Sequence, residues 1–222
     1  MTAQPTYRCL VEHYEACLDV HGVNHRGVDW PDEKGMALRF EVMLGLLQAP
    51  PPHARLLDLG CGPGLLLDHI AQRGPGTAIA YSGIDLSPKM IVAAEARHPH
   101  ADFSVRDLLK EPLAPRSFDY VVMNGLLTEK RALSQAQMVD FTQRMICAAF
   151  EAAAIGVAFN VMSSHVDWTR DDLFHWPADE LLAFAVKHLT RHVVLRADYG
   201  LYEYTAYLYR APNGAREDNR HA

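Results

Sequence analysis

Three glycines follow an apolar run in the segment LLDLGCGPG, which spans residues 56–64, and they occupy positions 60, 62 and 64. Glycine allows positive φ angles and lets the backbone approach a bound molecule closely. A helix that begins directly after such a turn offers free N–H groups to a ligand. The segment therefore predicts a ligand-binding turn between a strand and a helix. On its own, the turn fits both a dinucleotide and a different nucleoside cofactor.

Two acidic residues narrow the choice of ligand. Asp85 ends the next predicted strand about 20 residues after the glycines, where a carboxylate can accept hydrogen bonds from both hydroxyls of a ribose. Asp107 ends the third predicted strand, and with the apolar Leu108 it suits the amine and ring face of an adenine. Taken singly, Asp85 also fits a turn cap and Asp107 also fits a helix start. Together with the glycine turn, the two acids predict a nucleoside cofactor.

Four successive segments between residues 55 and about 125 resemble the cofactor motifs of class I S-adenosylmethionine-dependent methyltransferases, namely LLDLGCGPG, GIDLSPKM, VRDLL and FDYVVMNG. The resemblance is to stand-alone, bacterial-type enzymes that act on small molecules. The glycine spacing agrees with the GxGxG pattern of that family, whereas the dinucleotide fingerprint is GxGxxG. The resemblance implies S-adenosylmethionine as the cofactor and S-adenosylhomocysteine as its product.

The resemblance also assigns cofactor contacts to individual residues. Asp58 would hold the glycine turn in place, and Gly60, Cys61 and Gly62 would contact the methionine moiety. Asp85 and Leu86 would contact the ribose, and Asp107 and Leu108 would contact the adenine. Asn124 would lie beside the sulfonium. Cys61 is interpreted as a small packing residue, because no basic neighbour in the sequence would lower the pKa of its thiol. Arg39, on a helix before the motifs, is either a solvated surface residue or a partner of the cofactor carboxylate.

Candidates for catalysis and acceptor binding come from the chain after the motifs, because ligands of open α/β sheets lie at the carboxyl ends of the strands. Methyl transfer is an in-line displacement and needs a general base only when the acceptor must lose a proton. His165 is the first choice for that base, since its usual pKa is near neutral, and Glu129 is the second. The residues that could position an acceptor, each of which also fits a surface salt bridge or turn contact, are Lys130, Arg170, Tyr199, Tyr202 and Glu203.

Alternating strands and helices must position these residues. Apolar runs predict strands at 55–59, 78–85, 103–106, 118–123 and 155–162, and the segments between them include helices at 65–73, 88–97 and 134–151. This alternation predicts a doubly wound, Rossmann-like α/β fold with a mostly parallel sheet. After a helix at 177–189, strands at 193–198 and 202–209 are so close in sequence that they must form an antiparallel hairpin, which completes seven strands.

Three regions are expected along the chain. Residues 1–50 predict a helical extension or lid made of two helices joined by a polar loop. The second helix carries one apolar stripe, formed by Met36, Phe40, Leu44 and Leu47. Residues 51–211 form the predicted methyltransferase core, and the polar residues 212–222 predict a disordered tail.

Composition excludes several classes of protein. The chain has 222 residues, of which 49% are hydrophobic and 22% charged, as expected of one globular domain. A net charge of -6 and the absence of an NPPY motif after the fourth strand argue against nucleic acid as a partner. The four cysteines form no CxxC pair, and no leader or membrane span is evident, which indicates a cytoplasmic protein. The histidines form no recognisable ligand pattern, so no metal is expected. The oligomeric state is left open.

The sequence thus predicts an S-adenosylmethionine-dependent methyltransferase that transfers a methyl group to oxygen or nitrogen of a small-molecule acceptor. Methylation of protein or nucleic acid is an alternative, with nucleic acid disfavoured by the charge. An NAD-dependent oxidoreductase would keep the strand, turn and acid pattern, but it needs a different glycine spacing and leaves the terminal hairpin unexplained. A regulator that binds the cofactor without catalysis would have the same motifs.

Overall fold

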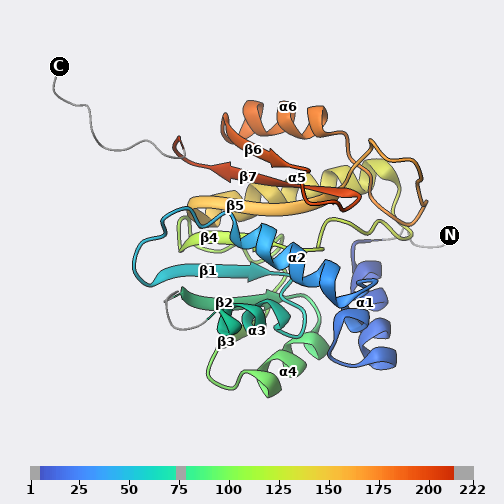
Figure 1. The fold of residues 1–222 in the computed structure, drawn as a ribbon, viewed down its shortest axis with the longest axis vertical. Coiled ribbons are helices and arrows are strands. Elements are labelled where there is room, and N and C mark those ends of the chain that lie inside the picture. Colours follow the sequence, from blue (N-terminus) through green and yellow to red (C-terminus); the bar gives the residue numbers. More distant parts are fainter. Residues whose placement is uncertain (1–5, 74–78, 213–222) are drawn as a thin grey trace.

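The computed structural model describes residues 6–73 and 79–212, which form one sheet with helices on both faces (Figure 1). The strands are β1 (Ala54–Leu59), β2 (Ile79–Asp85), β3 (Asp102–Val105), β4 (Phe118–Met123), β5 (Ala153–Met162), β6 (His192–Arg196) and β7 (Glu203–Tyr209). The helices are α1 (Arg8–His21), α2 (Glu33–Leu44), α3 (Leu65–Gln72), α4 (Pro88–Arg97), α5 (Gln135–Ala152) and α6 (Ala178–His188), and a short 3-10 helix, η1 (His25–Val28), lies between α1 and α2.

The sheet has seven strands in the order β3-β2-β1-β4-β5-β7-β6. The pairs among β1 to β5 are parallel. Strand β7 is antiparallel to both of its neighbours, β5 and β6, so the C-terminal hairpin is inserted at one end of the sheet. The predicted fold class is confirmed: a doubly wound, mostly parallel seven-stranded sheet with a C-terminal antiparallel hairpin and N-terminal helices.

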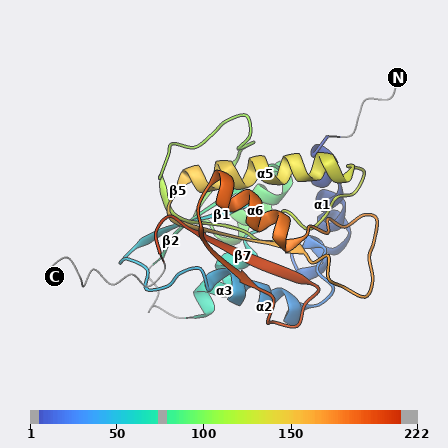
Figure 2. The same cartoon turned by 90° about the horizontal axis from the view of Figure 1, so that it is seen from above.

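Two hydrophobic clusters cover the two faces of the sheet (Figure 2). Helices α5 and α6 pack on one face, and α2 and α3 pack on the other. Strand β4 shows how one sequence serves both clusters, since Val121 and Met123 belong to the first and Tyr120 and Val122 belong to the second. This period of two is the alternation of side chains along a strand. Both faces of the sheet are therefore buried.

Helix-capping residues place several boundaries where the sequence predicts them. The Ser87 hydroxyl accepts a hydrogen bond from the Met90 backbone N–H, and Pro88 follows as the first residue of α4. Ser134 and Gln137 form a capping box at the start of α5. These caps satisfy backbone N–H groups that have no partner within the helix. Local chemistry thus fixes where α4 and α5 begin beside the cavity.

The two N-terminal helices have different surroundings. Helix α2 packs on the sheet, and Met43 and Leu46 at its end are fully buried among side chains of β1, β4, β5 and β7. Helix α1 instead lies beyond the strand ends and contacts η1 and α4 (Figure 1). The loop between them contains η1, which was not predicted and which begins where the Asn24 side chain accepts hydrogen bonds from two backbone N–H groups. The boundary at residue 50 and the lid role stay predictions.

The predicted disordered tail at 212–222 lies outside the described residues except for its first position. Over the residues that the structure describes, no helix has the length and apolar character needed to cross a membrane.

Replacing Met43 by alanine tests whether α2 is part of the folded core. The free energy of unfolding should fall by about 2–5 kcal/mol, because the truncation leaves a cavity between α2 and the sheet. Urea denaturation measures the change. The control is Val20→Ala on the exposed side of α1, where the side chain is 74% exposed and the expected change is within about 0.5 kcal/mol. Equal effects of the two substitutions would contradict this placement of α2.

Candidate functional site

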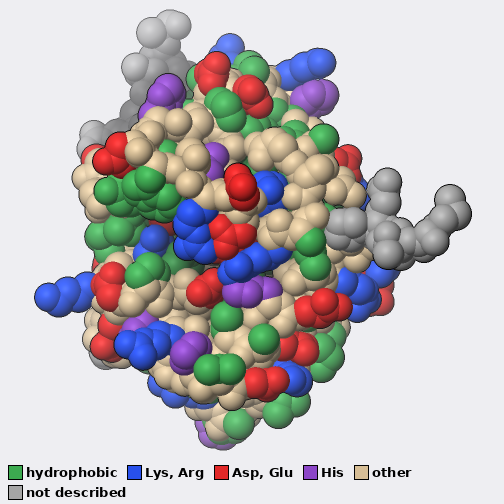
Figure 3. Space-filling view, turned by 90° about the vertical axis from the view of Figure 1, so that its right-hand side faces the viewer, with side chains coloured by type: hydrophobic (Ala, Val, Ile, Leu, Met, Phe, Trp, Pro, Cys, Tyr) green, Lys and Arg blue, Asp and Glu red, His purple; other side chains and the backbone are tan. Residues whose placement is uncertain are grey.

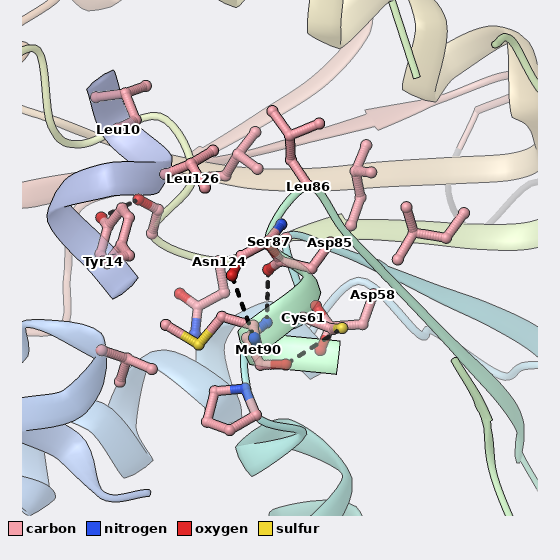
Figure 4. Close-up of a pocket in the computed structure, with 18 of the residues that line it drawn as sticks. Leu10, Tyr14, Asp58, Cys61, Asp85, Leu86, Ser87, Met90, Asn124 and Leu126 are labelled. Atoms are coloured by element: carbon pink, nitrogen blue, oxygen red, sulfur yellow. Dashed lines mark hydrogen bonds between the residues drawn. The ribbon is translucent and has the colours of Figure 1, made fainter. Parts of the chain in front are cut away.

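A cavity of roughly 1130 Å³, counted with the open space at its mouth, lies beyond the carboxyl ends of β1, β2, β3 and β4. Figure 4 shows Asp85 at the end of β2, Leu86 directly after it, Asn124 after β4, and Leu10 and Tyr14 on α1 gathered around the cavity. Nine of the residues that the resemblance assigns to cofactor binding line this cavity, and Arg39 is the exception. The nine are Asp58, Gly60, Cys61, Gly62, Asp85, Leu86, Asp107, Leu108 and Asn124. The fold therefore brings these nine residues together.

The glycine turn has the backbone conformation that its sequence predicts. Gly60 and Gly62 have φ angles of 78° and 53°, which residues with side chains rarely adopt. A Cβ atom on Gly60 would also lie 2.5 Å from Leu126 Cδ1, so Leu126 would have to move to make room for a side chain. The turn thus presents bare backbone to the cavity.

Asp85 joins the glycine turn to the start of α4. Its Oδ2 accepts a hydrogen bond from the Gly62 backbone N–H at 2.9 Å, and its Oδ1 accepts one from the Ser87 backbone N–H at 2.8 Å. Burial raises the pKa of Asp85, and the backbone hydrogen bonds from Ser87 and Gly62 oppose the shift. The carboxylate therefore holds the turn in place and still faces the cavity (Figure 4).

Asp58 is a second acid at the floor of the cavity. It is buried and accepts a hydrogen bond from the Tyr81 hydroxyl at 2.8 Å. Burial raises the pKa of Asp58 to about 7; the hydrogen bond from Tyr81 opposes this shift, and the charge of Asp85 adds to it. A cationic group close to both acids would favour their ionised forms. This part of the cavity suits a positively charged ligand group.

The opposite end of the cavity contains Asp107 and a pair of aromatic rings. The Tyr7 hydroxyl donates a hydrogen bond to Asp107 at 2.8 Å, and the Lys110 ammonium lies 2.9 Å from the same carboxylate. Burial opposes ionisation of Asp107, but the contacts with Lys110 and Tyr7 outweigh it and lower the pKa of the carboxyl. The rings of Tyr7 and Phe141 stack with their centroids 5.1 Å apart. A flat apolar surface thus lies next to an ionised acid.

Asn124 and Cys61 differ in what they offer to a ligand. The buried Asn124 Oδ1 atom has no hydrogen-bond partner among the described residues, although such atoms are normally paired. Cys61 belongs to a small apolar cluster with Ile91 and Phe103, and burial raises the pKa of its thiol. Its thiol is therefore neutral, which agrees with the packing interpretation. Asn124 is left as an unused polar group in the cavity wall.

Arg39 and Glu203 bind each other, and Arg39 is buried, so it is not the solvated surface residue that the sequence also allowed. Arg39 Nε donates a hydrogen bond to Glu203 Oε2 at 2.9 Å, and the two side chains are only 10% and 1% exposed. Arg39 is not among the residues that line the cavity. Buried charges of opposite sign must pair to offset the loss of water. This placement gives no support for Arg39 as a partner of the cofactor carboxylate or for Glu203 as an acceptor contact.

The remaining acceptor candidates also lie outside the set of residues that line the cavity. His165 is exposed, and its backbone N–H donates to the Ser163 hydroxyl. Most of the others make local contacts, with Lys130 donating to the Asp171 carbonyl, Arg170 pairing with Asp172, Tyr199 bonded to Thr205, and Tyr202 half exposed with its ring 5.0 Å from that of Trp168. Partners outside the cavity lining hold these side chains, and the contacts of Lys130 and Tyr202 join different loops. Their predicted roles gain no support from the structure.

Glu129 belongs to a charged cluster that joins α1 and η1 to the loops after β4 and β5. Arg131 lies 2.9 Å from Glu129, 2.8 Å from Asp29 and 3.1 Å from Asp172, and His13 lies 2.7 Å from Asp29. Burial raises the pKa of Glu129 to about 6, and the charge of Arg131 opposes the shift. Figure 3, which views the molecule from the α1 side, shows acidic, basic and histidine side chains close together. The cluster thus links α1 and η1 to the loops after β4 and β5 along one contact region, called the seam below.

The same seam contains a group of possible metal ligands. Ligand atoms of His13, Cys17 and Asp29 all lie within 4.8 Å of one another. The Arg131 guanidinium already contacts both His13 and Asp29. Because this cation of the chain itself neutralises Asp29, no metal role is assigned to the group.

Sequence reasoning missed the residues that line the cavity from the N-terminal segment, including Tyr7, Tyr14, Trp30 and Phe40. The Tyr14 hydroxyl lies 3.3 Å from the Gly125 carbonyl, to which it donates, and burial raises the pKa of Tyr14, which keeps the hydroxyl protonated. Aromatic residues at helical spacing fit any buried face, so residue type alone gave no signal. Only the placement of the N-terminal segment against the strand ends shows which of these aromatic residues face the cavity.

Comparison with known proteins agrees with this geometry. A methyltransferase domain family matches residues 56–145. A Mycobacterium tuberculosis protein that is named a methyltransferase is 32% identical over 159 residues, which cover 69% of this chain and 92% of that protein. The chain belongs to the class I S-adenosylmethionine-dependent methyltransferases.

Two further comparisons concern parts of this methyltransferase or its fold. The trans-aconitate 2-methyltransferase of Mycobacterium tuberculosis is 40% identical over 74 residues, which are 33% of this chain and 26% of that enzyme. The magnesium protoporphyrin IX methyltransferase of Synechocystis PCC 6803, solved with bound S-adenosylmethionine, has a TM-score of 0.65 at 15% identity and covers 95% of this chain and 100% of its own. The second similarity shows a shared fold alone.

The raised pKa of Asp58 makes the stability of the methyltransferase depend on pH. The folded state binds the proton more tightly than the unfolded state, so this group stabilises the fold at low pH and loses that contribution as pH rises through about 7. Relative to wild type, Asp58→Asn should therefore gain roughly 2–4 kcal/mol of stability between about pH 4 and about pH 8. Urea denaturation across this range measures the difference. A difference that does not change with pH would contradict the assignment.

Proposed function

We propose that this methyltransferase transfers the methyl group of S-adenosylmethionine to oxygen or nitrogen of a small molecule. The observation that carries the proposal is the cavity itself, which combines the nine motif residues with a cover of α1 and η1 from the same chain. Tyr14 and Trp30 in this cover leave little room for a large acceptor to approach. An acceptor small enough to enter beside them fits the cavity best.

The residues present fit the cofactor of the family. S-adenosylmethionine supplies an electrophilic methyl group on a cationic sulfur when it is bound. Asp58 and Asp85 provide negative charge and hydrogen-bond acceptors near the bare glycine turn, and Asn124 Oδ1 provides an unpaired acceptor in the same wall. At the other end, Asp107 and Leu108 would hold the adenine. These contacts are part of the proposal.

The chain's own residues act mainly by alignment, because an in-line displacement depends on the position of the reacting atoms. Tyr14, held protonated beside the Gly125 carbonyl, would orient an acceptor by hydrogen bonding. Apolar residues of the cover, such as Leu10 and Val28, would exclude water from the methyl group. Where the acceptor must lose a proton, Glu129 is kept as the proposed base; it lies outside the cavity lining and pairs with Arg131, and burial raises its pKa to about 6.

The charges that line the cavity narrow the proposed acceptor. Arg106 is the one cationic side chain among the described lining residues, whereas Asp58, Asp85 and Asp107 are acidic. An acceptor with several carboxylates, such as the trans-aconitate named for one relative, would find few partners there. We therefore propose an uncharged or cationic acceptor with an apolar or aromatic body. Nucleic acid is not expected as a partner, and a cytoplasmic location is proposed, which is consistent with free thiols on the four cysteines.

Asp85→Ala tests the proposed ribose contact. The substitution removes an acceptor for two ligand hydroxyls, and hydrogen bonds to a charged group contribute about 1.5–3 kcal/mol each, so the affinity for S-adenosylhomocysteine should fall at least about 10-fold. Titration calorimetry measures the affinity, and circular dichroism checks that the fold is intact. The control is Asp140→Ala on α5, where the side chain is 68% exposed. Unchanged affinity of Asp85→Ala would remove the ribose assignment.

The acceptor class is tested by incubating the enzyme with S-adenosylmethionine labelled on its methyl group and with separated small-molecule, protein and RNA fractions of a bacterial extract. We expect label in the small-molecule fraction, in uncharged or cationic compounds, and none with Asp85→Ala. Enzyme-dependent label in RNA or in protein alone would contradict the proposed acceptor.

A further inference from the structure

The turn after β4 is held from outside the cavity. Gly125 has a φ angle of 82°, lines the cavity next to Asn124, and donates its backbone N–H to Asn160 Oδ1 at 2.7 Å. Asn160 lies on β5 and is completely buried. The position of Asn124 in the cavity wall therefore depends on an amide side chain that does not itself line the cavity.

The orientation of the Asn160 amide is fixed by Glu203 on β7. Asn160 Nδ2 donates to Glu203 Oε1 at 3.0 Å, which directs the Oδ1 atom toward Gly125. Without an acceptor at residue 203, the amide could rotate and present its N–H₂ group to the Gly125 N–H, and two donors repel each other. Glu203 thus selects which end of the amide meets the turn.

Arg39 completes the network from α2. It pairs with the second oxygen of Glu203, and its guanidinium lies 4.0 Å from the centroid of the Trp30 ring. Trp30 lines the cavity and presses on the turn so closely that a Cβ atom on Gly125 would lie 2.6 Å from the Trp30 ring. Asn160 and Trp30 therefore both contact Gly125, and both are bound to the same ion pair.

A buried ion pair contributes little to stability compared with apolar residues of similar volume, because removing two charges from water offsets their attraction. Stability alone therefore gives no reason for Arg39 and Glu203 at this place. Their contacts lead instead to one turn of the cavity wall.

We infer that Glu203 and Asn160 are positioning residues that hold the Asn124–Gly125 turn in the shape that binds the cofactor, and that Arg39 is the counter-charge that the buried Glu203 carboxylate needs. None of the three lines the cofactor cavity; Glu203 acts on the turn through the Asn160 amide. This inference rests on the proposed function, because it assigns the turn to cofactor binding.

Two double variants that differ at one position test the inference. Arg39→Met with Glu203→Leu removes the ion pair and the acceptor for Asn160. Arg39→Met with Glu203→Gln removes the charges but keeps an oxygen that can accept from Asn160 Nδ2. We expect the affinity for S-adenosylhomocysteine to fall at least about 10-fold in the leucine variant and to stay within about 3-fold of wild type in the glutamine variant. Amide hydrogen exchange at Gly125 should accelerate in the leucine variant alone.

A matched control is Arg55→Met with Asp119→Asn, which removes an ion pair at the amino ends of β1 and β4, whereas the cavity lies at their carboxyl ends. This control should leave the affinity for S-adenosylhomocysteine unchanged. Equal affinity of the two Arg39 and Glu203 variants, whether both normal or both reduced, would overturn the inference. If the leucine variant does not fold, Asn160→Ala replaces it, and normal affinity with normal Gly125 exchange would again overturn the inference. Failure of the proposed function is distinguishable, since it would abolish binding in the wild type and the control as well.

Discussion

The hydrogen bonds from the backbone N–H groups of Gly62 and Ser87 to the Asp85 carboxylate are the interaction on which the site depends. They join the glycine turn after β1 to the start of α4, so the carboxyl ends of the neighbouring parallel strands β1 and β2 are held together. Burial raises the pKa of both Asp85 and Asp58, which means that burial disfavours their ionised forms. A ligand that brings hydroxyl and cationic groups relieves this cost.

The N-terminal segment contributes to the site in two physically different ways. Helix α2 belongs to the core and anchors Arg39, whereas α1 and η1 cover the cavity and are joined to the loops after β4 and β5 by the charged cluster around Arg131. Apolar burial stabilises more than partly exposed ion pairs do. Leu10 is the buried residue of α1, whereas α2 buries Phe40, Val42, Met43 and Leu44, so α2 is attached more firmly than the cover.

Sequence reasoning succeeded where the signal was local. The positive φ angles of the glycine turn and the alternation of strands and helices each depend on residues a few positions apart, and the structure agrees with both. It failed for contacts that join distant positions, such as Tyr7 with Asp107 and Arg39 with Glu203. Residue type indicates that a buried arginine needs a partner but does not say which acid provides it. The exposed placement of His165 was hidden for the same reason, since loop direction depends on tertiary contacts.

The central claim is that the cavity beyond β1 to β4 binds S-adenosylmethionine and its product. Titration calorimetry of the purified protein with S-adenosylhomocysteine, and with NAD in parallel under the same conditions, tests this claim most directly. The account predicts binding of S-adenosylhomocysteine in the micromolar range and no binding of NAD. Binding of NAD alone, or of neither compound, would contradict it.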